Sequence, residues 1–188
     1  MLSISLRVLT PTDKHMLYRH YQELDNESKE CRFGNRISDD TLKNFIDHLN
    51  LDRDIHFAVV SNLDILALAQ VSKYSREFEN RLELGISVAT HSRRKGYASL
   101  LWDCATMHAT ACNMRDIYVL HSPCNLAMAT FCRKKGLRID NACDERVGIW
   151  TNPLWKPAPN SHQTTPLEMW PGTLPQPIPL EYSESTSP

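Results

Sequence analysis

The feature that most constrains this chain is a short basic turn that joins a strand-like segment to a helix-like one. Residues 82–88 alternate large apolar side chains with smaller or polar ones, which is the pattern of a β-strand. Residues 98–112 have the length and apolar content of a helix. The turn between them contains two arginines, a lysine and Gly96. A strand that leads through a glycine turn into a helix is typical of an anion-binding site.

The turn also has the charge that a phosphate group requires. A helix N-terminus leaves its first amide N–H groups unpaired and carries partial positive charge. Gly96 lets a ligand approach the main chain closely. Arg93, Arg94 and Lys95 add three cations to this one turn, in a chain whose formal net charge is −1. The alternative interpretation is an ordinary strand-to-helix turn with a solvated basic tip.

A second motif, residues 125–137, begins with an asparagine, continues with an apolar helical face and ends in a glycine and a leucine. Together with the Arg93-x-x-Gly96-x-Ala98 pattern of the turn, it resembles the paired signatures of the GNAT superfamily of N-acetyltransferases. Both motifs occur in the order and at the spacing of that family.

A third segment, residues 24–28 followed by Arg32-Phe33, is similar to the region after the first helix in bacterial protein-acetyltransferase members of the family. The whole resemblance covers about residues 4–150. It implies an α/β (α+β) chain with the GNAT fold: a mixed, mostly antiparallel central sheet with two splayed parallel strands. The implied element order is β-α-α-β-β-β-α-β-α-β-β.

The spacing of apolar residues independently supports this order. Alternation over residues 2–8 predicts the first strand, and the sequence from Thr10 to Asp13 has the residues of a helix start. Ser38 precedes a second amphipathic helix, and we expect the polar residues 24–37 between these helices to form a loop beside the acceptor site. Further strands are expected at residues 55–60, 65–74, 81–90 and 117–120, and a closing hairpin at 137–142 and 147–150.

Composition changes at Pro153. Nine of the eleven prolines lie from that residue onward, which disfavours long helices and strands. We therefore predict a GNAT domain at residues 1–152 and a proline-rich tail at residues 153–188. Trp155, Trp170 and other apolar residues in the tail leave two alternatives open, a disordered tail and one that packs on the domain or on a second subunit of a homodimer.

The resemblance implies acetyl-CoA as co-substrate. The splayed strands would be residues 82–88 and 117–121, with the pyrophosphate on the amides of residues 94–99 and the thioester near the Val88 N–H, which would stabilise the oxyanion. Two roles are open for Asn125: a contact to the cofactor, or an ordinary residue at the start of a helix. The implied cofactor-binding residues are Ile86, Ser87, Val88, Arg93, Arg94, Lys95, Gly96, Tyr97, Ala98, Ser99 and Asn125.

Glu83 is the candidate general base. It shares a strand face with Gly85 and Ser87, and Gly85 is expected to leave room for substrate. Partial burial would raise the pKa of the Glu83 carboxylate toward the range useful for taking a proton from an ammonium. A cross-strand partner for an arginine or lysine is the alternative role for this residue.

Cys132 occupies the position at which many GNAT enzymes have a tyrosine as general acid. A thiol with an unperturbed pKa of about 8.5 is able to protonate a CoA thiolate. The alternative role for Cys132 is core packing. If Cys132 instead lies beside the cofactor, oxidised samples are expected to form a disulfide between Cys132 and CoA. His121, at the end of a predicted strand, is a second candidate proton carrier.

The residues therefore predict an N-acetyltransferase whose acceptor is a protein lysine or a small amine. The alternative is a degenerate module that binds acyl-CoA as a sensor or scaffold without turnover, and a hydrolase that uses Cys132 and His121 has little support. The near-zero net charge argues against a nucleic-acid partner. The absence of long apolar runs and of a signal-like N-terminus predicts a cytoplasmic protein without a membrane partner. Six cysteines without a Cys-x-x-Cys pair predict no metal, although Cys104, His108 and Cys112 fall on one helical face.

Overall fold

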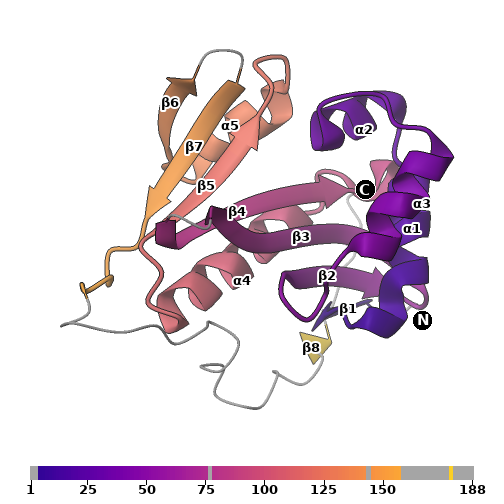
Figure 1. Cartoon of the computed structure of the whole chain (residues 1–188), viewed down its shortest axis with the longest axis horizontal. Coiled ribbons are helices and arrows are strands. Elements are labelled where there is room, and N and C mark those ends of the chain that lie inside the picture. The colour runs from indigo at the N-terminus through magenta and orange to yellow at the C-terminus, as the bar shows by residue number, and fades with distance from the viewer. Residues whose placement is uncertain (1–3, 76–77, 143–144, 158–177, 180–188) are drawn as a thin grey trace, which may run out of the picture.

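A single mixed β-sheet runs through the protein (Figure 1). The computed structural model describes residues 4–75, 78–142, 145–157 and 178–179. Its strands are β1 (Ile4–Val8), β2 (Ile55–Ser61), β3 (Asp64–Ser75), β4 (Phe78–Val88), β5 (Asp116–His121), β6 (Arg138–Ala142), β7 (Glu145–Thr151) and β8 (Ile178–Pro179). They lie in the order β6-β7-β5-β4-β3-β2-β1-β8, and among these described strands β4 and β5 form the parallel pair. The predicted sheet, mixed and mostly antiparallel, is confirmed.

Helices cover both faces of the sheet. The helices α1 (Lys14–Glu23) and α3 (Asp39–His48) pack on one face, and α2 (Asn26–Phe33) lies against β4 at the same side. The opposite face carries α4 (Tyr97–Ala111) and α5 (Leu126–Lys134). Neighbouring residues of β2 illustrate the division, because Ala58 belongs to the core beneath α1 and Val59 to the core beneath α4.

The segment expected as a loop between the first two helices contains the additional helix α2. Asp25 caps this helix by accepting the Ser28 N–H at 2.8 Å. Gly34 ends it with a φ of 78°, and its N–H donates to the Glu30 carbonyl. No residue of α2 is buried, so its polar sequence lacks the apolar periodicity by which a helix is recognised. The predicted element order otherwise agrees with the structure as far as β7, and β8 is a second element that was not predicted.

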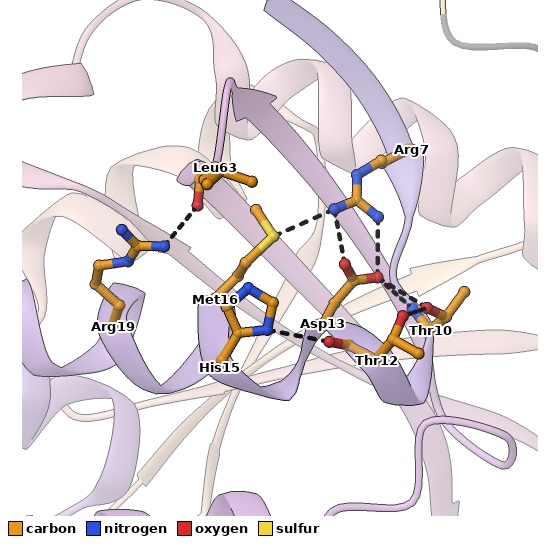
Figure 2. Close-up of polar contacts among 8 residues, drawn as sticks. All are labelled: Arg7, Thr10, Thr12, Asp13, His15, Met16, Arg19 and Leu63. Atoms are coloured by element: carbon orange, nitrogen blue, oxygen red, sulfur yellow. Dashed lines mark hydrogen bonds and ion pairs between the residues drawn. The ribbon is translucent and has the colours of Figure 1, made fainter.

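The first helical segment is anchored to β1 through a carboxylate (Figure 2). Both guanidinium NH2 groups of Arg7 donate to Asp13 at 2.9 Å, and the Thr10 N–H donates to the same carboxylate at 2.8 Å. These contacts, above all those from Arg7, lower the pKa of Asp13 to about 2. A short 3-10 turn (Pro11–Asp13) therefore precedes α1 as part of one hydrogen-bonded unit.

The beginning of the predicted tail contacts the domain. Asn113 donates from Nδ2 to the Lys156 carbonyl at 2.9 Å, and the Arg115 guanidinium lies 5.3 Å from the Trp155 ring. At the other edge of the sheet, β8 pairs with Ser5 and Leu6 of β1. The rest of the tail lies outside the described residues, so the proposed division at residue 152 stays a prediction. None of the described helices has the length and apolar content needed to span a membrane.

Candidate active site

The turn before α4 ends in an open helix start. Gly96 is the N-cap and provides no side-chain acceptor, while its own carbonyl accepts the N–H groups of Ser99 and Leu100 at 2.9 and 3.1 Å. Its φ is 85°, and Arg94 has a φ of 62°, a region that costs a non-glycine residue on the order of 1 kcal/mol or more. Strained residues of this kind are concentrated at ligand clamps. The turn thus presents main-chain donors at the positive end of a helix.

The three cations of the turn have different roles. Arg93 donates through Nη2 to the Asp25 carboxylate and to the Ser28 hydroxyl, at 2.5 and 2.6 Å. Thr90 donates to the same carboxylate at 3.1 Å. The Ser28 amide, together with Arg93, holds the pKa of the Asp25 carboxyl well below its usual range. Arg93 therefore attaches the turn to the start of α2, whereas the other two cations, Arg94 and Lys95, are exposed.

Strands β4 and β5 separate beside this turn, as predicted. Their parallel pairing begins at Arg81 and Asp116 and ends at Glu83 and Tyr118. Beyond that point β4 continues to Val88 without pairing with β5, and the two arrows diverge in Figure 1. We call the region between the diverging strand ends the gap; beside it, the described residues of β4 after Glu83 have no pairing with β5.

The main-chain groups that line this gap follow from the pairing of β4 with β3. The Ala89 N–H donates to the Leu66 carbonyl at 2.9 Å, so the main chain of Ala89 faces β3. Facing directions alternate along an antiparallel strand. The N–H and C=O groups of Val88 and Ile86 therefore point away from β3 and toward the gap.

The main chain and the hydroxyl of Ser87 both have partners within the domain, and its assignment to the cofactor-binding residues stays a prediction. By the same alternation its main chain faces β3, where it is paired with Leu68. Its hydroxyl contacts His20 Nε2 at 2.8 Å. His20 Nδ1 lies 2.9 Å from the Ile65 carbonyl, which only accepts, so Nδ1 carries the proton and Nε2 accepts from Ser87. Burial lowers the pKa of His20 to about 4 and keeps this ring neutral.

Glu83 lies on the sheet face opposite α4. It is half-buried, and its register partners are Ser72 on β3 and Tyr118 on β5. The same face has Gly85 two residues further along, next to the gap. This position suits a group that exchanges protons with an acceptor in the gap, and the role of Glu83 as base stays a prediction.

The space above Gly85 is filled by Arg32, which corrects the expectation that this glycine leaves room for substrate. A Cβ at Gly85 would lie 3.2 Å from the Arg32 Cζ atom. Arg32 comes from the last turn of α2 and donates through Nη2 to Gln70 Oε1 at 2.5 Å. No motif links Arg32 to Gln70, because the two residues are far apart in the chain and Gln70 belongs to none of the recognised segments.

The surroundings of Cys132 favour the alternative role of core packing over that of general acid, which stays a prediction. Its side chain is fully buried, and a Cβ at Gly148 of β7 would lie only 2.9 Å from its sulfur. Burial raises the pKa of this thiol to about 11. Cys132 packs α5 against β7, and the disulfide with CoA stays a prediction as well.

His121 is better placed than Cys132 to carry a proton. It ends β5 at the gap and is buried, with Nδ1 3.0 Å from the Ser122 carbonyl. Because a carbonyl only accepts, Nδ1 carries the proton. Nε2 has no hydrogen-bond partner among the described residues. Nε2 is thus a buried ring nitrogen at the end of β5 that is placed to exchange a proton.

Asn125 is the N-cap of α5. Its Oδ1 accepts the Met128 N–H at 2.9 Å, which is the role expected of a helix-start residue. Only its Nδ2 group is left to contact a cofactor, and that contact stays a prediction.

The residues considered for a metal, Cys104, His108 and Cys112, lie on α4 or at its C-terminal end. His108 is buried and packs edge-on against Phe57, and burial lowers its pKa. Its Nδ1 lies 3.7 Å from the sulfur of Cys112. Within the described part of the chain, no three His, Cys, Asp or Glu side chains are grouped to hold a metal ion.

The diverging parallel strands and the open helix start beside them are the two features expected of the GNAT fold. The family model "Acetyltransferase (GNAT) domain" matches residues 3–138. The chain therefore belongs to the GNAT family of acetyltransferases, which confirms the resemblance. No curated protein matches the sequence.

Solved structures with the same fold are similar to this chain at low identity. The GNAT domain of S. lividans PAT has a TM-score of 0.67 and 18% identity, over 78% of this chain and 89% of that one. The ribosomal-protein-S5-alanine acetyltransferase from Vibrio fischeri has a TM-score of 0.65 and 16% identity, over 84% and 100%. The spermidine N-acetyltransferase from Vibrio cholerae, solved with CoA and spermine, has a TM-score of 0.60 and 16% identity, over 79% and 95%.

Proposed function

We propose that this protein transfers an acetyl group from acetyl-CoA to a primary amine by direct attack of the amine on the thioester. The observation that carries the proposal is the open start of α4 beside the gap between β4 and β5. The diphosphate of acetyl-CoA would accept the amides that follow Arg93, with Arg94 and Lys95 beside it. The pantetheine arm would then pair with the main chain of Ile86 and Val88, as an added strand pairs with a sheet edge.

The thioester would lie in the gap, beside the main chain of β4. There the Val88 N–H, or that of Ile86, is directed to stabilise the oxyanion that forms when the amine attacks. Glu83 would take the proton of the acceptor ammonium from the opposite face. His121 is the second candidate proton carrier: its Nε2 would accept the proton that the attacking nitrogen loses and pass it to the departing thiolate.

The names of similar structures support an amine acceptor, but they do not distinguish a protein amine from a small-molecule amine. One is named for alanine of ribosomal protein S5 and another for spermidine. A protein amine and a small amine thus both occur as acceptors on this fold. We infer the broader class, a primary amine, for this chain.

Replacement of Glu83 by Gln tests the proposal. Loss of the base should lower kcat by about 100-fold or more, while the Kd for acetyl-CoA stays within about twofold. The measurement is thiol release in the presence of a panel of amines, together with acetyl-CoA binding by calorimetry. Glu23→Gln, at an exposed position at the end of α1, is the control and should leave both quantities unchanged. An equal loss of affinity and rate in Glu83→Gln would assign Glu83 a structural role.

A second candidate function is a module that binds acyl-CoA without turnover. The observation that favours it is the burial of Cys132 at the usual position of the general acid. Such a module would be stabilised against thermal unfolding by acetyl-CoA, yet would release no thiol with any amine. Release of CoA that depends on both the amine and Glu83 would rule it out.

A further inference from the structure

The Arg32 guanidinium lies between α1, α2 and the sheet, next to the gap. On one side it covers Gly85, whose missing Cβ makes room for it. On the other side its Cζ atom lies 5.8 Å from the Tyr21 ring centre and 5.5 Å from that of Phe33. A hydrogen bond to Gln70 Oε1 fixes its orientation. Arg32 is half-buried, so its charge is only partly screened by water.

This position lies on the route of any acceptor that approaches from the face opposite α4. Gly85 immediately precedes Ile86, whose main chain faces the gap, and Glu83 lies two residues earlier on the same face as Gly85. An amine that reaches the thioester from this side therefore passes between the carboxylate of Glu83 and the guanidinium of Arg32. One group suits the ammonium, and the other suits an anion.

The two histidines that lie near Arg32 on this face are neutral, so they add no further charge beside the guanidinium. His56 is the register partner of Gln70. His20 contacts Ser87, which lies two residues after Gly85 on β4. Burial and the nearby Arg32 charge lower the pKa of both histidines, so they are neutral. A guanidinium carries five N–H donors in a planar fork, and Gln70 occupies a single donor group.

From this geometry we infer that Arg32 selects small amine acceptors that carry a carboxylate, as amino acids do, and disfavours diamines and polyamines. The carboxylate would bind the remaining guanidinium donors while the amine faces Glu83 and the thioester. A second ammonium at the same place would be repelled. This inference rests on the proposed transferase function and names its substrate class.

The experiment compares acceptors that differ only in the carboxylate: lysine with cadaverine, ornithine with putrescine, and alanine with ethylamine. In the wild-type protein we expect kcat/KM for thiol release to be at least 10-fold higher for the carboxylated member of each pair. In Arg32→Gln the preference should fall to within twofold, mainly through a higher KM for the carboxylated member. Arg32→Glu should reverse it in favour of the diamines.

Three controls separate selection from folding. Arg36→Gln removes a nearby exposed arginine that is paired with Glu30, and it should keep the wild-type preference. The Tm and the acetyl-CoA Kd should change little in Arg32→Gln. If that variant does not fold, Arg32→Lys keeps the charge without the planar fork and should retain part of the preference.

A second measurement, calorimetric binding of the acetylated products in the presence of CoA, tests the Arg32 assignment separately from the transferase function. No thiol release with any amine, but tighter binding of Nε-acetyl-lysine than of N-acetylcadaverine, would overturn the transferase function and keep the Arg32 assignment. Equal binding, binding of neither product, or a preference unchanged in Arg32→Gln would overturn the assignment. Transfer confined to peptide amines would overturn it as well.

Discussion

The helices α4 and α5 pack on the same face of the sheet, yet their N-termini are completed differently. Asn125 closes the start of α5 with its own side chain, which accepts the Met128 N–H. Asp25 and Ser38 close α2 and α3 in the same way. The start of α4 has Gly96 at the corresponding position and no side chain to accept. A helix start that is satisfied within the chain stabilises the fold, whereas one left open offers the same donors to a ligand.

The open start has a cost in stability. A glycine N-cap is less stabilising than Ser, Thr, Asp or Asn by about a few tenths of a kcal/mol, and Gly96 is the N-cap of α4. Arg94 in addition adopts a left-handed conformation that a glycine would adopt without strain. The chain therefore maintains an unfavourable local conformation at the place where we propose the diphosphate binds.

The largest expected effect comes from closing α4 with a charge. Gly96→Asp should weaken acetyl-CoA binding by roughly 100-fold, which is about 2.7 kcal/mol, because the carboxylate occupies the anion site and repels the diphosphate. The control is Gly136→Asp, since both glycines have positive φ and open space beside them. Calorimetry should show similar losses of Tm in the two variants and a loss of affinity only in Gly96→Asp. Equal affinities would refute the difference between the two kinds of helix start.

Asp13→Asn tests a third arrangement, in which a carboxylate before α1 is held by Arg7. Loss of the charged hydrogen bonds should lower the free energy of unfolding by about 2 kcal/mol at pH 7. Because folding lowers the pKa of Asp13 to about 2, the difference between wild type and variant should be full above about pH 4 and disappear as the pH falls through 2. Urea titrations at several pH values measure it.

The control for Asp13 is Asp64→Asn, which removes an exposed ion pair with Arg19. That variant should change the free energy of unfolding by less than about 0.5 kcal/mol. A pH-independent loss in Asp13→Asn would contradict the role of the charge.

Asn125→Ala opens the start of α5 without a ligand to fill it. We expect a loss of about 1 kcal/mol in the free energy of unfolding, with acetyl-CoA affinity within about twofold. Asn125→Ser restores a capping hydroxyl and should recover most of the stability. If the alanine variant binds acetyl-CoA 10-fold more weakly and the serine variant does not recover, Asn125 contacts the cofactor as well.

The smallest effect is expected at Arg94. Because its φ is positive, Arg94→Gly should be more stable than Arg94→Ala by about 0.5–1 kcal/mol, although glycine destabilises most ordered positions. Both variants lose the same cation, so their affinities for acetyl-CoA should fall equally and modestly. A glycine variant that is less stable than the alanine variant would show that the turn is not strained.

The parts of the site that the sequence predicts are those made of contiguous residues. The turn from Arg93 to Ser99 and the strand before it are specified by local chemistry, so their form follows from the glycine and the apolar alternation. The acceptor face is assembled from residues that are distant in the chain. Arg32 and Gln70 meet above Gly85 only because α2 folds over β4, and α2 itself lacks an apolar face. The burial of Cys132 likewise depends on its contact with Gly148 in another strand.

The most direct test of the central claim is an NMR titration of the 15N-labelled protein with acetyl-CoA. We expect the largest amide shifts at residues 94–99 and further shifts at Ile86 and Val88. The amides of Leu126 and Met128, at the closed start of α5, should move little. Binding that leaves residues 94–99 unchanged, or no binding at all, would contradict the claim.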